Sequence, residues 1–262
     1  MVNRKILIFV FFTIFLEIIL YVPSIKADAY VIIGSHDGFL FNEETYYIVG
    51  EVENIGTESA YLVIIDATLY DANYTFIAEE RGFVIPEMIM PKQKAPFIVS
   101  FENASQASKV SKYTLDGSIW DTTLDTRLEG LRILSQSHLI AIDGYMDITG
   151  EIKNTGIETS TNTMVYVMCY DVNGTVVYVS LSPDIPVELA AGQQTTYEML
   201  IQPDKAPFID TCVISAQSEE YLCYDYPTVV IPEFPLFFLV PFFGMFTLLA
   251  MILKKTMLRA RN

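Results

Sequence analysis

The residues best suited to catalysis are two histidines that stand far apart in the chain. His36 follows Ser35 in a loop-like stretch and His138 follows Ser137 at a strand start, and each histidine stands alone. A hydrolytic nucleophile needs a base beside it, and the chain has no His-x-x-x-His or Cys-x-x-Cys spacing and no glycine-rich phosphate loop. We therefore expect a protein that is not an enzyme. The alternative, an extracellular hydrolase, would need a clustered site that the sequence does not show.

Two acid and amide pairs could begin calcium loops. Asp71 with Asn73, and Asp171 with Asn173, place oxygen ligands at alternate positions of a tight turn. An EF-hand would need a further Asp or Asn, a central Gly and a distal Glu, and these are missing. Asp and Asn also satisfy the backbone groups of turns, and this structural interpretation is the one we favour. Calcium that bridges acidic domains is the only cofactor that we consider.

Three Asn-x-Ser/Thr sequences are acceptors for N-linked sugar in an exported chain. They begin at Asn73, Asn103 and Asn173. Two of the three, Asn73 and Asn173, occupy corresponding positions in two expected hairpin turns. We expect a glycoprotein.

Three cysteines lie in the second half of the chain. In an exported protein a pair of them can oxidise. A bridge across the sandwich between Cys169 and Cys212 is one pairing, and a short loop closed by Cys212 and Cys223 is the other. Buried free thiols are the alternative to both.

The N-terminus has the three-part plan of a secretory signal. Arg4 and Lys5 precede an apolar run, Ile6–Val22, and the small residues Ala27 and Ala29 stand at positions −3 and −1 of a cut after residue 29. A retained membrane anchor would need no such cleavage site. We expect export.

An apolar segment near the C-terminus is long enough to span a bilayer. Leu236–Leu253 is 18 residues without a charge, which as a helix would extend about 27 Å. The basic residues that follow it are Lys254, Lys255, Arg259 and Arg261. Basic residues beside a span stay on the cytoplasmic side, so we expect a single-pass protein of the cell membrane with its N-terminal ectodomain outside. The lipid bilayer is then its first partner.

The ectodomain is strongly acidic. Residues 30–230 carry 29 acidic and 9 basic side chains, and this net charge of −20 excludes nucleic acid as a partner.

The chain between the two apolar ends contains two copies of one sequence repeat. A shift of 100 residues gives ten identities over positions 48–75. The first copy supplies Ile48, Gly50, Glu51, Asn54, Gly56, Glu58, Tyr70, Asp71, Asn73 and Thr75, and each recurs 100 residues later. A repeat of about 100 residues is a normal single domain.

The pattern within each copy has period two, which is typical of half-buried strands. Val63, Ile65, Ala67 and Leu69 share one face and correspond to Thr163, Val165, Val167 and Cys169. Asn173 and Gly174 predict a two-residue hairpin turn of type I′, in which both residues have positive φ. No convincing amphipathic helix occurs. Short strands separated by Gly, Pro and Asn predict an all-β chain of two tandem antiparallel β-sandwiches.

We expect seven segments. They are a signal peptide (1–29), a first sandwich (30–118), a linker (119–129), a second sandwich (130–228), a stalk (229–235), a transmembrane helix (236–253) and a cytoplasmic basic tail (254–262).

The motif Gly50, Asn54, Gly56 followed by Leu69, Tyr70 and Asp71 resembles the FxLYD family of small extracytoplasmic domains. The second copy keeps Tyr170 and Asp171 but has Cys169 in place of the leucine. Lys94, Ala95, Pro96 and Phe97 are similar to the turn and strand that close such domains. The resemblance implies an immunoglobulin-like sandwich on a membrane-anchored protein and implies no activity.

The stalk carries Pro232, Glu233, Phe234 and Pro235. With the span and the basic end, this motif resembles the PEF-type C-terminal sorting signals of archaeal surface proteins. The resemblance implies an archaeal envelope protein whose tail is cut by an archaeosortase-like enzyme. A plain single-span anchor has the same physical design.

These features predict a noncatalytic, membrane-anchored surface protein, either an envelope component or a binding and adhesion module whose partners are other envelope proteins or glycans. The alternative is an accessory subunit of a membrane complex, a transporter or secretion system, that docks a partner protein through its sandwiches.

Overall fold

The computed structural model describes residues 29–124, 126–182, 185–223 and 228–230. The predicted transmembrane helix, cytoplasmic tail and sorting motif, and all of the predicted signal peptide except Ala29, lie outside these residues. Ala29 packs into the first hydrophobic core. The described residues contain no helix that is both long and apolar enough to cross a membrane.

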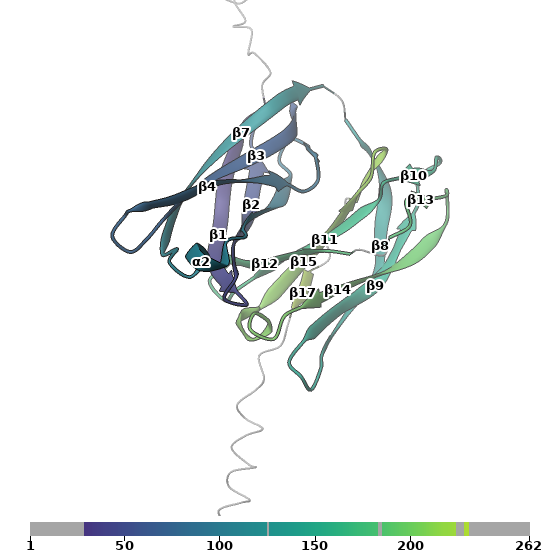
Figure 1. Cartoon of the computed structure of the whole chain (residues 1–262). Coiled ribbons are helices and arrows are strands. Elements are labelled where there is room, and N and C mark those ends of the chain that lie inside the picture. Colours follow the sequence, from purple (N-terminus) through teal and green to yellow (C-terminus); the bar gives the residue numbers. More distant parts are fainter. Residues whose placement is uncertain (1–28, 125, 183–184, 224–227, 231–262) are drawn as a thin grey trace, which may run out of the picture.

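The first sandwich contains the elements of residues 31–123 (Figure 1). They are β1 (Val31–Phe41), β2 (Thr45–Asn54), β3 (Ser59–Tyr70), β4 (Phe76–Val84), β5 (Met88–Ile89), β6 (Lys94–Phe101), α2 (Ala104–Ala107) and β7 (Lys112–Thr123). One layer has the order β1-β2-β6 and the other has β3 between β4 and β7. The end of β4 pairs with β6 and joins the layers along one edge.

The second sandwich contains the elements that follow. They are β8 (Leu128–Ile140), β9 (Met146–Asn154), β10 (Ser160–Thr161), β11 (Met164–Tyr170), β12 (Val176–Leu181), β13 (Glu188–Leu189), β14 (Gln194–Ile201), the 3₁₀ helix η1 (Ala206–Phe208), β15 (Thr211–Gln217), β16 (Tyr221–Cys223) and β17 (Thr228–Val230). One layer is β8-β9-β14 and the other has β11 between β12 and β15, with β17 beside β15. Here β16 runs parallel to β8 and joins the layers.

The two sandwiches use the same strand plan at an offset of 100 residues. For example, β6 begins at Lys94 and β14 at Gln194, and β5 and β13 begin at Met88 and Glu188. The predicted inward face of β3 is buried throughout, since Val63, Ile65, Ala67 and Leu69 are at most 1% exposed. The prediction of an all-β chain with a sandwich arrangement is confirmed.

The connection between the sandwiches is shorter than the predicted linker. Strand β7 continues to Thr123 and β8 begins at Leu128, so only 124–127 lies between the two strands. The predicted linker, 119–129, overlaps both strands, because β7 pairs with β3 along its whole length.

Candidate functional site between the two sandwiches

The asparagine of the repeated motif is a buried structural residue. Asn54 is fully buried, and its Nδ2 donates to the carbonyl oxygens of Glu58 at 2.8 Å and Ile89 at 2.9 Å. Its Oδ1 accepts from the amide of Gly56 at 3.0 Å. One side chain therefore ties the turn after β2 to strand β5.

The second copy builds the same arrangement. Asn154 donates to the carbonyl oxygens of Glu158 and Leu189, both at 2.8 Å, and accepts from the amide of Gly156 at 2.9 Å. A buried polar group is stable only when its hydrogen bonds are made. The repeated sequence motif therefore specifies the fold of each copy.

The acid and amide pairs also have structural roles. Oδ1 of Asp171 accepts hydrogen bonds from the amides of Asn173 at 2.9 Å and Thr175 at 2.7 Å, and Asp71 makes the same two bonds in the first copy. These backbone hydrogen bonds, led by the one from the threonine, hold the pKa of both carboxyl groups below its ordinary value. Within the described residues, no three His, Cys, Asp or Glu side chains form a metal-binding group. Calcium at these turns stays a prediction that titration calorimetry can test.

The turn type predicted for Asn173 and Gly174 is wrong. A type I′ turn needs positive φ at both residues, but only Gly174 has it, at +78°. The amide of Gly174 donates to the carbonyl of Asp171, so the positive φ falls on the fourth residue of the turn. Tyr74 adopts the same conformation in the first copy, with φ of +63°, and the Lys112 ammonium lies 3.3 Å from the centre of its ring.

The three predicted glycosylation residues lie in different surroundings. Asn73 and Asn173 are exposed at the tips of their hairpins. Asn103 is half-buried before α2, and its Oδ1 accepts from the Ser105 hydroxyl at 2.8 Å.

The disulfide joins Cys169 to Cys212, one of the two pairings considered. These residues face each other on the neighbouring strands β11 and β15, with their Cα atoms 4.1 Å apart. The bond therefore lies within one sheet and does not cross the sandwich. Cys223 is buried in the core of the second copy.

The two sandwiches are joined by a hydrophobic cluster of their own. Val49 of the first copy packs with Met168, Val176 and Val179 of the second, and all four side chains are at most 5% exposed. Strand β12 lies against β1, β2 and β6. Because burial of such side chains contributes about 1.5–3 kcal/mol each, the contact is a stable interface.

A buried carboxylate adds a polar link to this interface. Glu51 is 6% exposed and accepts hydrogen bonds from the Tyr170 hydroxyl at 2.8 Å and from Lys94 Nζ at 2.7 Å. Burial, followed by the hydrogen bond to Glu51 and then by the Glu51 charge, raises the pKa of Tyr170 far above its ordinary value. The tyrosine therefore stays neutral and continues to donate.

Two further hydrogen bonds connect the copies. The amide of Val176 donates to Ser35 Oγ at 3.0 Å, and Nε2 of buried Gln217 donates to the carbonyl of Met88 at 3.1 Å. In the segment 124–127 between the sandwiches, burial lowers the pKa of Arg127. The negative charges of Glu87 in the first copy and Glu219 in the second raise this pKa and so oppose the effect of burial. The two copies are thus held at several separate points.

A nearly buried ammonium reaches from the second copy to the first. Lys205 is 9% exposed, and its Nζ lies 3.6 Å from Oδ2 of Asp37 and 3.4 Å from the ring centre of Phe39. Burial lowers the pKa of Lys205, while the charges of Asp37 and Asp204 raise it. The ion pair and the cation–π contact offset part of the cost of burying this charge.

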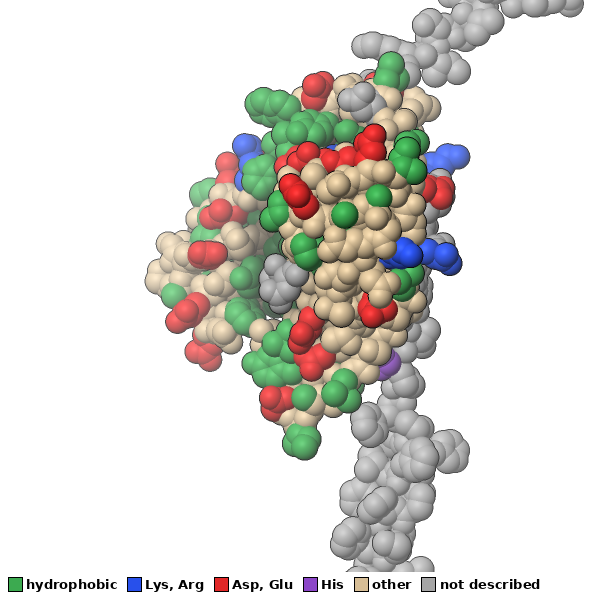
Figure 2. Space-filling model, turned by 90° about the vertical axis from the view of Figure 1, so that its right-hand side faces the viewer, with side chains coloured by type: hydrophobic (Ala, Val, Ile, Leu, Met, Phe, Trp, Pro, Cys, Tyr) green, Lys and Arg blue, Asp and Glu red, His purple; other side chains and the backbone are tan. Residues whose placement is uncertain are grey.

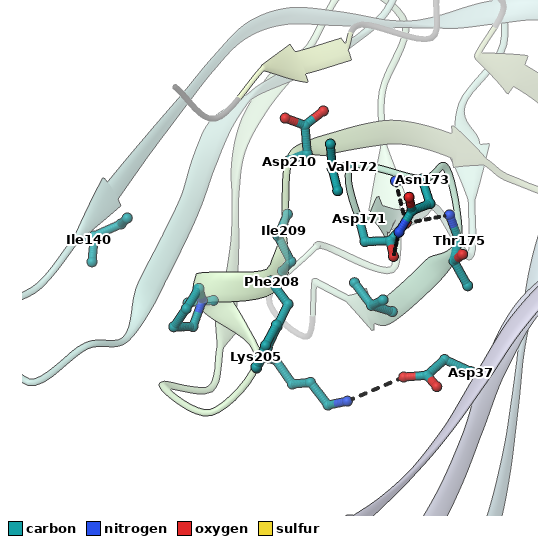
Figure 3. A pocket seen from close by; sticks show the side chains of 13 residues that line it. Asp37, Ile140, Asp171, Val172, Asn173, Thr175, Lys205, Phe208, Ile209 and Asp210 are labelled. Atoms are coloured by element: carbon teal, nitrogen blue, oxygen red, sulfur yellow. Dashed lines mark hydrogen bonds and ion pairs between the residues drawn. The ribbon is translucent and has the colours of Figure 1, made fainter. Parts of the chain in front are cut away.

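A cavity of about 780 Å³ lies beside this ion pair (Figure 3). Its wall includes Asp37 of the first copy and Asp171, Asn173, Lys205 and Phe208 of the second. Of the four residues predicted as weak calcium ligands, Asp171 and Asn173 line this cavity, and Asp71 and Asn73 do not. The dashed lines in Figure 3 show the Asp171 carboxylate bonded within its own turn and Lys205 directed toward Asp37.

The histidines are not brought together. His36 lies on β1, with its Nδ1 2.9 Å from the Tyr113 hydroxyl oxygen, and His138 lies on β8 of the other copy. Burial lowers the pKa of His36, and the nearby Asp37 charge opposes this.

The contacts that hold the interface, made by Glu51, Tyr170, Lys205 and Asp37, were not predicted from the sequence. One signal was available. The outward positions of the repeat differ in polarity, since Val49 corresponds to Thr149 and Ile98 to Glu198, which indicates that one copy is covered on this face and the other is not.

No protein-family model matches the chain, and no curated protein matches it. Solved structures with weak similarity to it are found. A β-glucuronidase 2 variant from Bacteroides uniformis is 15% identical over 76% of this chain and 28% of its own, with a TM-score of 0.28. The exo-chitosanase of Amycolatopsis orientalis is 13% identical over 77% and 26%, with a TM-score of 0.30. Red sea bream transglutaminase is 10% identical over 78% and 31%, with a TM-score of 0.26. The chain thus spans less than a third of the length of each.

Proposed function

We propose that this is a noncatalytic, single-pass protein of the cell surface whose two sandwiches act as one rigid extracellular unit. The sandwiches would be immunoglobulin-like domains of the FxLYD type. The unit would serve as an envelope component or as a binding and adhesion module that holds a partner at a fixed distance from the membrane. Other envelope proteins and glycans are the partners that we propose.

The observation that carries this proposal is the interface between the copies. A flexible tandem would leave Val49, Met168 and Glu51 in water, whereas each is at most 6% exposed. A continuous buried contact fixes the orientation of the sandwiches, as a spacer or presenting module requires. The motif residues Asn54 and Asp171 stabilise the fold, which supports a scaffold role.

The sequence supports the location. An export signal, an acidic ectodomain, the uncharged segment Leu236–Leu253 and the basic end together favour an anchored chain with its sandwiches outside. Asn73 and Asn173 on exposed tips are open to glycosylation. The PEF-type motif supports removal of the tail by an archaeosortase-like enzyme in an archaeal envelope, and a plain anchor is the other form.

Peptide mass spectrometry of the protein from native envelopes tests this proposal. We expect the chain to float with membranes, to begin near Tyr30 and to carry sugar on at least one of Asn73, Asn103 and Asn173. Loss of everything after Pro235 would support a sorted protein, and recovery of Leu236–Leu253 would support a plain anchor. A chain that begins at Met1 and stays in the soluble fraction would contradict the proposal.

A second function is favoured by apolar side chains near the connection. Trp120, Leu124 and Leu128 are each at least 71% exposed, and exposed apolar groups of this size mark interaction sites when they gather. In this alternative the chain is an accessory subunit of a transporter or secretion complex. Purification in mild detergent would recover a stoichiometric integral-membrane partner, and Trp120→Ser with Leu128→Ser would release it. A chain that purifies alone would exclude this function.

A further inference from the structure

The last described strand directs the chain out of one end of the second sandwich. Strand β17 is antiparallel to β15, and its final residue Val230 lies opposite Thr211, the first residue of β15. The loop with η1 immediately precedes β15. The chain therefore leaves the sandwich at the end that carries η1.

The hairpin between β8 and β9 projects from this same end. Met146 at the start of β9 pairs with Ile140 on β8 and with Ile201 at the end of β14, just before the η1 loop. In Figure 1 this hairpin forms the lower tip of the second sandwich. We call this end, with the hairpin tip and the η1 loop, the exit end.

Large apolar side chains are exposed to solvent at the exit end. Ile142 is fully exposed, Phe208 is 65% exposed and Ile140 is 43% exposed. The hairpin tip is a defined turn, because the amide of Gly144 donates to the carbonyl of Ala141 at 2.9 Å. Ile142 is thus presented outward by an ordered backbone.

The short segment between β17 and the predicted membrane span limits the distance between the exit end and the bilayer. From Val230 to Leu236, the first residue of the uncharged segment, there are six peptide steps, which span at most about 20 Å. A bilayer that holds Leu236–Leu253 therefore lies within about 20 Å of the exit end.

We propose that the exit end is a membrane-contact surface, on which Ile142 and Phe208, supported by Ile140, insert into the outer interface of the bilayer. This inference rests on the proposed anchoring of the chain. Apolar side chains on loop tips gain free energy when they enter the interfacial region. The contact would fix the tilt of the rigid unit, because two separate loops engage the same surface.

The chemistry of the contact is apolar and not electrostatic. Asp143, Asp204 and Asp210 flank the two loops, and Lys205 is directed toward Asp37. Figure 2, which views the molecule from the right-hand side of Figure 1, shows more acidic than basic surface on this face. The surface therefore fits a neutral or zwitterionic bilayer, and anionic lipid should weaken the contact.

Tryptophan fluorescence of the full chain in zwitterionic bilayers tests this inference. Trp120 is the only tryptophan of the chain, so a Trp120→Phe background leaves one reporter in each variant. Ile142→Trp and Phe208→Trp place it on the exit end. Ile157→Trp is the matched control, since Ile157 is 91% exposed after the opposite end of β9.

Lipids with bromine on the upper acyl chain should quench Ile142→Trp and Phe208→Trp by at least half and leave Ile157→Trp and wild-type Trp120 unchanged. Flotation of the same vesicles distinguishes the proposed anchoring of the chain from the proposed membrane-contact surface. A chain that does not float contradicts the anchoring. A chain that floats while Ile142→Trp and Phe208→Trp stay as bright as Ile157→Trp would overturn the membrane-contact surface and leave the anchoring intact.

Discussion

The outer face of β1-β2-β6 in the first sandwich and that of β8-β9-β14 in the second have the same fold and different surroundings. Val49 of the first face is buried by the second sandwich, whereas its counterpart Thr149 lies on a face that nothing in the described structure covers. Ile98 and its counterpart Glu198 differ in the same sense. Polarity at a few outward positions thus decides which copy accepts a neighbour.

The opposite layers show the reciprocal difference. Met168 and Val179 of the second copy are buried in the interface, and their counterparts in the first copy are Thr68 and Glu79. Each copy therefore has one docking face and one polar face. The repeat therefore encodes a closed pair and not the start of an extended array.

The largest expected loss of stability comes from placing the residues of the β8-β9-β14 outer face on the β1-β2-β6 outer face. Tyr47→Asp, Val49→Thr and Ile98→Glu together should weaken docking by on the order of 5 kcal/mol, because they remove apolar burial and place charge at the interface. Calorimetry should then show two unfolding transitions in place of one. The reverse changes, Asp147→Tyr, Thr149→Val and Glu198→Ile, are the control and should leave one transition. A single transition in both variants would show that this face does not hold the pair together.

The buried asparagines should be equally important in both copies, because they belong to the shared fold. Asn54→Ala and Asn154→Ala each leave two carbonyl groups and the amide of the following glycine without their partner, at a cost of about 3 kcal/mol or more. Asn54→Ala also removes the acceptor of the Tyr30 amide. Denaturant unfolding measures this cost. An effect below about 1 kcal/mol in either copy would contradict the role given to the motif.

Tyr170→Phe tests the polar link and should cost about 1–2 kcal/mol, since Glu51 loses one donor. The raised pKa of Tyr170 gives a pH dependence. Its contribution to stability is complete below the unfolded pKa of about 10 and is lost as pH rises above it. The variant should therefore lose less stability than wild type between about pH 9 and pH 11. Tyr70→Phe, at the same position of the first copy, is the control and should follow wild type.

The smallest effect concerns the hairpin tips. Gly174→Ala should cost about 1 kcal/mol through positive φ alone, because a Cβ there would meet no atom within 4 Å. Gly117→Ala is the control, since its Cβ would make only ordinary contacts, at 3.6 Å or more. Thermal unfolding compares the two. Equal melting temperatures would show that the tip does not constrain its backbone.

Periodicity and self-similarity predicted much of the fold. The register of the repeat follows from identities at an offset of 100 residues. The inward face Val63 to Leu69 follows from alternation, because it depends only on residues near in sequence. The linker was placed too broadly because the pairing of β7 with β3 is a long-range contact that local pattern does not contain.

The interface was harder to predict. Glu51 and Glu151 are identical in the repeat, yet only Glu51 is buried beneath Tyr170. Position 205 has Lys where the first copy has Ser105, so self-similarity gave no signal for the contact with Asp37. Which copy covers the other depends on the geometry of two folded domains, and the polarity of Val49 against Thr149 was the sequence feature that indicated it.

We propose that the two sandwiches form one rigid unit. The most direct test is the distance distribution between spin labels at Ser118 on the outer face of the first copy and Thr196 on the outer face of the second, measured by pulsed electron paramagnetic resonance. Both residues are exposed. We predict one narrow peak, which broadens when Tyr47, Val49 and Ile98 carry the residues of the second copy. A broad distribution in the wild-type protein would show that the two sandwiches move independently.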